Sequence, residues 1–163
     1  MTASASGTPI PSFDADALMA SLRARIGLQT TPTVTEVEKG AIAKFARSIG
    51  ATSPLHFDEH YARSSRFGGI VAPATYVSTF ITGHIPDIYA STEPLTRTLH
   101  SDDTARIHRP IRAGDVITAH ARYVDAVLKA GRKGPLVFQS ADLILDAQDG
   151  ERIAEVRVVS VSF

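Results

Sequence analysis

The side chains best suited to acid–base chemistry lie close together, just after Pro54. His56 lies two residues beyond that proline, and its imidazole can accept or donate a proton near neutral pH. Asp58 and His60 follow at intervals of two, a spacing that would suit a metal ion if the three side chains converged. Asp58, however, is well placed to cap a helix, which would carry His60 away. We therefore expect His56 to act without a metal ion or a cofactor.

Helical signals dominate the first half of the chain. Ile42, Phe45, Ala46 and Ile49 recur at the spacing of one helix face and predict a helix over residues 36–49, which Gly50 would end. Capping residues and prolines predict three further helices, which begin near Ser12 or Asp14, at Asp58, and after Pro73.

Strand signals dominate the second half. Alternating or β-branched stretches predict strands at residues 31–35, 95–100, 104–108, 116–127, 136–145 and 153–163. Ser101-Asp102-Asp103 is interpreted as a solvated turn, and Asp149-Gly150 as a hairpin turn. Helices followed by an antiparallel meander indicate an α+β architecture, with the helix at 36–49 expected to fill the concave face of the sheet.

Bulk properties restrict the classes of partner. The 163 residues suit one domain, expected at 12–163 after a disordered leader at 1–11. Lys and Arg number 17, as do Asp and Glu, so we expect no binding to nucleic acid or to an anionic membrane. No signal peptide or long apolar run is evident and there is no Cys, which together favour a cytoplasmic protein.

Four segments, taken together, resemble the MaoC-like hydratase/dehydratase family, in particular the N-terminal halves of MaoC-type dehydratases. The first is Gly50-Ala51-Thr52-Ser53-Pro54-Leu55-His56-Phe57-Asp58, which is similar to the family signature Gly-Asp-x-Asn-Pro-x-His-x-Asp. In this chain Ala51 replaces the catalytic Asp, and Ser53 replaces the Asn. The other three segments are residues 67–73, residues 108–115, which contain Arg109-Pro110 and Gly114-Asp115, and the Asp149-Gly150 hairpin with its last strand.

The resemblance implies a hot-dog fold, an antiparallel sheet wrapped around a long central helix, from about Thr31 to the C-terminus. It also implies a site at which His56 acts on a water molecule, with Ser53 as a further catalytic candidate. The backbone N–H of Ala74 would stabilise the enolate oxygen, because Pro73 has no N–H to offer. The residues expected to border the substrate are Ala51, Gly69, Val71 and Tyr76.

Three functions are compatible with these residues. The first is hydration of an enoyl thioester or dehydration of a 3-hydroxyacyl thioester, carried by CoA or by a carrier protein, with an acid such as Asp102 or Asp103 replacing the missing Asp. The second is a non-catalytic hot-dog subunit, which the Ala51 replacement favours. The third is a hot-dog enzyme of different chemistry, such as a thioesterase or a tailoring enzyme. In each case the resemblance implies a homodimer, or a heterodimer with another MaoC-like subunit, since hot-dog relatives join two sheets edge to edge.

Overall fold

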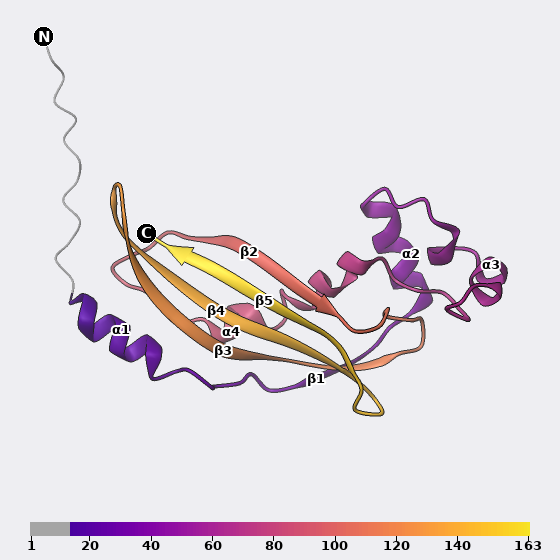
Figure 1. Cartoon of the computed structure of the whole chain (residues 1–163), viewed down its shortest axis with the longest axis horizontal. Coiled ribbons are helices and arrows are strands. Elements are labelled where there is room, and N and C mark those ends of the chain that lie inside the picture. The colour runs from indigo at the N-terminus through magenta and orange to yellow at the C-terminus, as the bar shows by residue number, and fades with distance from the viewer. Residues whose placement is uncertain (1–13) are drawn as a thin grey trace, which may run out of the picture.

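An antiparallel five-stranded sheet with strand order β1–β3–β4–β5–β2 is the largest element of the structure. The computed structural model describes residues 14–163, so the expected leader and Ser12 lie outside the described residues. The strands are β1 (Thr33–Glu36), β2 (Thr98–Ile107), β3 (Val116–Gly131), β4 (Gly134–Ala147) and β5 (Arg152–Ser162). The three long neighbours β3, β4 and β5 form the middle of the sheet, which curves strongly along its length (Figure 1).

The turn between β4 and β5 follows the sequence prediction. Gly150 adopts a left-handed conformation with φ of 83°, which glycine tolerates without steric cost. Its N–H donates to the carbonyl of Ala147 at 2.9 Å, and the N–H of Ala147 donates to the carbonyl of Glu151 at 2.8 Å. The expected Asp149-Gly150 hairpin is therefore confirmed.

Strand β2 corrects the prediction of two short strands separated by a turn. Its pairing with β5 continues from Thr98 to Ile107, with one irregularity between His100 and Asp102. Ser101 is the extra residue of this β-bulge. Ser101, Asp102 and Asp103 therefore lie within a strand, because the ladder with β5 outweighs their preference for turns.

Helices flank both ends of the sheet. The α-helices are α1 (Ala15–Arg23), α2 (Lys39–Ser48), α3 (Glu59–Ser64) and α4 (Ile85–Ile88), and the 3₁₀ helices are η1 (Pro54–His56) and η2 (Ala74–Phe80). The side chain of Asp14 accepts from the N–H of Ala17 at 2.9 Å, and that of Asp58 from the N–H of Tyr61 at 3.0 Å, so both expected caps are confirmed. None of the helices in residues 14–163 has the length and apolar character needed to cross a membrane.

The helix that packs on the middle of the sheet is α4 rather than the predicted helix at 36–49. Helix α4 contacts β3 and β4 and buries Ile85 and Ile88. Helix α2 contacts η1 and lies with α3 at one end of the sheet (Figure 1). Ile42 is buried as expected, but Ile49, which follows the last residue of α2, is 49% exposed. An apolar stripe thus identified a helix correctly but not the surface on which it packs.

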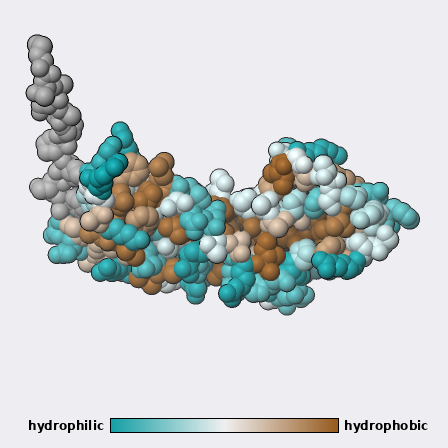
Figure 2. Space-filling view, turned by 45° about the horizontal axis from the view of Figure 1, so that its top comes forward, coloured by the Kyte–Doolittle hydropathy of each residue, from teal (hydrophilic) through white to brown (hydrophobic). Residues whose placement is uncertain are grey.

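A polar network fixes the chain after α4 to the sheet. Gln139 on β4 is only 2% exposed. Its Oε1 accepts from the N–H of Ala90 at 3.0 Å and from the hydroxyl of Tyr123 at 2.9 Å, and its Nε2 donates to the carbonyl of Ala90 at 3.0 Å. Burial raises the pKa of Tyr123 to about 12, so its hydroxyl keeps the proton that it donates. The face of the molecule seen in Figure 2, by contrast, mixes hydrophobic and hydrophilic residues.

His84 forms a second polar link, between the start of α4 and the edge strand β1. The side chain is 3% exposed, and its Nε2 lies 3.0 Å from the hydroxyl of Thr33. Burial lowers the pKa of His84, and repulsion from His120 adds to that effect, while Asp87 opposes it. The folded protein therefore favours the neutral imidazole.

We expect Gln139→Leu to lower the free energy of unfolding by about 2 kcal/mol, because it leaves the Ala90 N–H and the Tyr123 hydroxyl buried without partners. Gln148→Leu is the matched control, since Gln148 is exposed and its replacement should change stability by no more than about 0.5 kcal/mol. Urea unfolding followed by circular dichroism measures both. Equal stabilities of the two variants would contradict this role for Gln139.

We also expect the free energy of unfolding to fall as the pH drops below the unperturbed His pKa of 6.5. The unfolded chain binds a proton there that folded His84 resists, so protons favour unfolding. His84→Gln, which cannot titrate, should reduce the loss of stability between about pH 7.5 and about pH 5. His60→Gln, at an exposed position, should leave that loss unchanged. An unaltered pH dependence in His84→Gln would refute the assignment.

Candidate active site

The loop that carries His56 is set by the end of α2. Gly50 has φ of 69°, its N–H donates to the carbonyl of Arg47 at 3.1 Å, and the N–H of Ala51 donates to the carbonyl of Ala46 at 2.8 Å. These two bonds form the Schellman motif, which ends a helix and reverses the chain. Ala51 therefore occupies a fixed position at the start of the loop that leads into η1.

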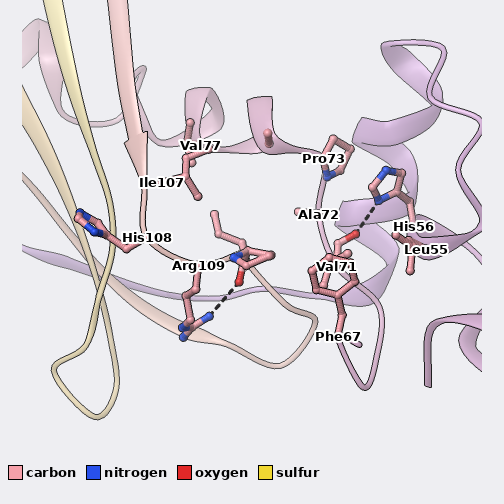
Figure 3. Close-up of a pocket in the computed structure, with 13 residues that line it drawn as sticks. Leu55, His56, Phe67, Val71, Ala72, Pro73, Val77, Ile107, His108 and Arg109 are labelled. Atoms are coloured by element: carbon pink, nitrogen blue, oxygen red, sulfur yellow. Dashed lines mark hydrogen bonds between the residues drawn. The ribbon is translucent and has the colours of Figure 1, made fainter. Parts of the chain in front are cut away.

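A short hydrogen bond orients the ring of His56. Its Nδ1 lies 2.7 Å from the carbonyl oxygen of Val71 (Figure 3). A carbonyl can only accept, so Nδ1 carries the proton and, in the neutral ring, Nε2 keeps a free lone pair. The N–H of Val71 donates in return to the carbonyl of Leu55 at 3.2 Å. Val71 thus holds His56 in the tautomer that a general base at Nε2 requires.

The segment that includes Val71 is also bound on its other side. The N–H of Ala72 donates to the carbonyl of Ile111 at 2.8 Å, and the N–H of Ala113 donates to the carbonyl of Ile70 at 3.0 Å. This short antiparallel contact brings the His56 loop close to the chain that follows β2.

A pocket of about 430 Å³ lies between these segments. Figure 3 shows His56, Phe67 and Val71 on one side, and Ile107, His108 and Arg109 on the other. Its lining is mainly apolar and comprises Leu55, His56, Phe67, Val71, Ala72, Pro73, Ala74, Val77, Ile107, His108, Arg109, Pro110 and Ile111. None of these residues is an Asp or a Glu, so among the described residues the pocket wall offers the imidazoles of His56 and His108 but no carboxylate.

An ion-pair cluster shapes the wall opposite His56. Arg109 Nη1 donates to Asp115 Oδ2 at 2.8 Å, and its Nε donates to Glu151 Oε2 at 2.9 Å. The hydrogen bond to Asp115 raises the pKa of Arg109. Asp115 Oδ2 also accepts from the N–H of Arg112 at 2.7 Å, and Gly114 has φ of 87°. The Arg-Pro and Gly-Asp pairs of this segment therefore build a rigid turn.

Two of the predicted site residues share the pocket with His56. Val71 is 3% exposed and lines it, as does Ala74. Ala74 begins η2, and the first N–H groups of a helix have no acceptor within the helix. Its N–H is thus available to an oxygen atom in the pocket, although its predicted role in binding the enolate oxygen stays a prediction.

The other predicted residues lie outside the pocket wall. Ala51, Ser53 and Gly69 are half-buried and are not among the lining residues. Tyr76 is 8% exposed and packs edge-on against Phe45, with ring centroids 5.2 Å apart. Burial raises the pKa of Tyr76, and nearby Glu38 adds to the effect. The predicted roles of these four residues remain predictions.

Several lining residues were missed by the sequence reasoning. Ile107, His108 and Arg109 come from the end of β2 and the turn after it, far from His56 in the chain. The Arg109-Pro110 motif had been noted, but nothing in its spacing places it opposite His56. As for metals, no group of three or more His, Cys, Asp or Glu residues within 14–163 is arranged to hold an ion.

Comparison with known proteins gives the geometry its context. The family model "FAS1-like, dehydratase domain region" matches residues 24–156. A UPF0336 protein of Clavibacter michiganensis is 30% identical over 101 residues, which are 60% of this chain and 66% of that protein. A UPF0336 protein of Parafrankia is 28% identical over 131 residues, which are 77% of this chain and 83% of that protein.

Solved structures show the same fold. A chain of the Mycobacterium tuberculosis HadBC (3R-hydroxyacyl-ACP dehydratase) complex superposes with a TM-score of 0.72 at 20% identity, covering 84% of this chain and 96% of that one. A MaoC-like dehydratase from Rhodospirillum rubrum gives 0.63 at 22% identity, covering 85% and 92%. The M. tuberculosis ChsH1-ChsH2 complex gives 0.69 at 18% identity, covering 91% and 90%.

These findings confirm the expected α+β hot-dog fold and the resemblance on which it rested. The family match extends from the end of α1 to within β5, so it includes the His56 loop and both walls of the pocket. The chain belongs to the FAS1-like dehydratase-domain family, a group of MaoC-like hot-dog proteins.

Proposed function

We propose that this chain binds an enoyl or 3-hydroxyacyl thioester in the His56 pocket and takes part in its hydration or dehydration, as a hydro-lyase. The observation that carries the proposal is the orientation of His56 by Val71, which leaves Nε2 free beside an apolar pocket. Apolar walls suit an acyl chain. The HadBC dehydratase and an R-hydratase from Pseudomonas aeruginosa share the fold, which supports this class of reaction.

Each group has a role in that reaction. During hydration, the oxygen of a water molecule bonds to C3 while Nε2 of His56 accepts the proton of that water. Negative charge develops on the thioester oxygen, where the N–H of Ala74 would stabilise it. A proton must then reach C2. Ala51 has none to give, and the hydroxyl of Ser53, two residues farther along the same loop, is our candidate donor. The thioester is carried by CoA or by a carrier protein, and Ala51, Gly69, Val71 and Tyr76 would border or support the bound acyl group.

We further propose that the chain works as a dimer with a second hot-dog subunit. Strand β2 is an edge of the sheet, and every residue from Thr98 to Ile107 is exposed. A long exposed edge presents unpaired backbone groups, which proteins cover or pair. Two structural neighbours belong to complexes of two components, HadBC and ChsH1-ChsH2.

A second candidate function is that of a non-catalytic subunit beside an active one. The absence of any Asp or Glu from the lining of the described pocket, together with Ala51, favours it. No comparable observation favours a thioesterase, because Glu36 lies on β1 and Glu38 directly precedes α2, both outside the pocket wall.

We expect His56→Ala to reduce hydration of crotonyl-CoA by about 10²–10⁴-fold, the usual contribution of a general base. Loss of enoyl absorbance measures the rate, and calorimetric titration measures crotonyl-CoA binding. His60→Ala is the control, because His60 is exposed on α3 and outside the pocket. Binding without hydration in the wild type would favour the non-catalytic subunit. Absence of both would overturn the proposed function.

We expect Ala51→Asp to raise the hydration rate. The spacing from residue 51 to His56 equals that of the family signature, so the new carboxylate should share a water molecule with the imidazole. The half-buried loop position should accept the charge without unfolding. The decisive comparison is with Ala51→Asp/His56→Ala, which should lose the gain. Equal rates for the single and the double variant would show that His56 does not act on the substrate.

A further inference from the structure

Strand β2 carries a strip of exposed side chains on its inner face, the face that it shares with the buried side chains of β5. The strip consists of His100, Asp103, Ala105 and Ile107. Each of these residues is paired with a buried residue of β5, and residues opposite each other in a ladder point to the same face. The four residues are nevertheless exposed, so the core does not cover this part of the sheet. We call them the inner strip.

The far end of the inner strip is an imidazole beside a carboxylate. The extra residue Ser101 brings His100 and Asp103, three apart in sequence, to the same face. His100 Nε2 lies 3.1 Å from Asp103 Oδ1, and 55% and 34% of the two side chains are exposed. An ionised carboxylate has about four acceptor positions. Asp103 can therefore accept a further hydrogen bond while His100 holds it in place.

A buried hydroxyl group lies beside this pair. Ser160 is the direct partner of His100 in the ladder and is 5% exposed. Its Oγ is one of two buried side-chain atoms within residues 14–163 that have no hydrogen-bond partner, the other being Nε of Arg25. The nearby hydroxyl of Tyr89 donates to the carbonyl of Val158 at 2.7 Å. A buried polar atom without a partner costs free energy, which a bound polar group would recover.

The inner strip connects these polar groups to the candidate active site. Ile107 is 39% exposed and lines the His56 pocket together with Val77 of η2 (Figure 3). Ala105, the next residue of the strip, carries only a methyl group. An apolar path thus leads from the pocket to a polar cluster, which comprises His100, Asp103 and Ser160.

We propose that the acyl chain bound in the His56 pocket extends along the inner strip, and that the polar cluster binds a hydroxyl group at the far end of that chain. This inference rests on the proposed function and narrows its substrates to acyl thioesters with a hydroxylated end. The hydroxyl donates to Asp103 and accepts from Ser160. These two residues are diagonal neighbours in the ladder, a separation of about 7–8 Å that leaves room for one oxygen atom between their side chains.

The length of the inner strip sets the length of the acyl chain. Ile107 and Asp103 lie opposite Ala154 and Val158, and a strand rises about 3.4 Å per residue, so they are about 14 Å apart. An extended main chain has three atoms per residue, and an extended alkyl chain follows a similar zigzag, so about 12 carbon atoms cover this distance. Ser160 lies two residues farther along β5, which corresponds to about 18 carbon atoms.

The sign of the preference distinguishes this site from an ordinary apolar channel. An apolar channel binds a plain alkyl chain more tightly than a hydroxylated one, because burying a hydroxyl group without a partner costs free energy. A site built to bind the hydroxyl has the opposite preference. It rejects the plain chain, which leaves the polar groups of the site unpaired.

Two matched ligands test the inference, trans-2-hexadecenoyl-CoA and its 16-hydroxy analogue. The wild-type protein should bind the 16-hydroxy compound about tenfold or more tightly, as expected for a hydrogen bond to a charged group. Calorimetric titration below the critical micelle concentration measures both Kd values, whether or not the chain is catalytic. Equal affinities, or tighter binding of the plain chain, would overturn the inference.

Variants of the polar cluster locate the effect. Asp103→Ala and Ser160→Ala should each lose most of the preference for the 16-hydroxy compound and leave the Kd of hexadecenoyl-CoA unchanged. Ser160→Ala should not lower the free energy of unfolding, because the hydroxyl that it removes has no partner. Thr104→Ala and Ser140→Ala, on the opposite face of the sheet, are the controls and should keep the full preference. Retention of the preference in either cluster variant, or its loss in a control, would overturn the inference.

Crotonyl-CoA separates this inference from the proposed function, because its acyl chain is too short to reach the polar cluster. A protein that binds crotonyl-CoA but does not prefer the 16-hydroxy compound would retain the proposed function and lose the chain-end site. A protein that binds none of the three thioesters would overturn both.

Discussion

Main-chain hydrogen bonding on both sides of residues 70–72 holds the candidate site together. This buried segment bonds to the His56 loop on one side and to residues 111–113 on the other. Buried backbone groups must find partners, so neither loop can move away without leaving polar atoms unpaired. Three stretches that are remote in sequence are thereby fixed around one pocket, and the imidazole of His56 takes its tautomer from the same contact.

The local features of the fold could be predicted from the sequence because their causes are local. Asp58 caps a helix through its own side chain, and Gly150 reverses the chain because it tolerates a positive φ. The identity of the helix on the sheet could not be predicted in this way. The stripe around Ile42 shows that one helix face is buried. By contrast, α4 (Ile85–Ile88) and the 3₁₀ helix η2 (Ala74–Phe80) are too short to show a clear stripe. Long-range packing decided between them.

The residues of the candidate site show the same difference between local and long-range causes. His56, Val71 and Ala74 were predicted from the segment that contains them, and the structure places all three at one pocket. Ile107 and Arg109 could not be assigned to that pocket from the sequence. They form the wall opposite His56 only because the fold places the end of β2 and the turn after it there. The continuity of β2 through Ser101-Asp102-Asp103 was missed for a related reason. Its turn-like composition is overridden by pairing with β5, and the bulge absorbs the mismatch.

The buried amide of Gln139 has a consequence for the evolution of the family. It pairs with both the N–H and the carbonyl of Ala90, as a neighbouring strand would, and also receives the hydroxyl of Tyr123. An apolar residue at position 139 would leave three polar groups without hydrogen-bond partners: the N–H and the carbonyl of Ala90 and the hydroxyl of Tyr123. We therefore expect Tyr123, Gln139 and the course of the chain at Ala90 to be inherited together. Homologues that lose the amide should show a compensating change at position 123 and a different course of the chain after α4.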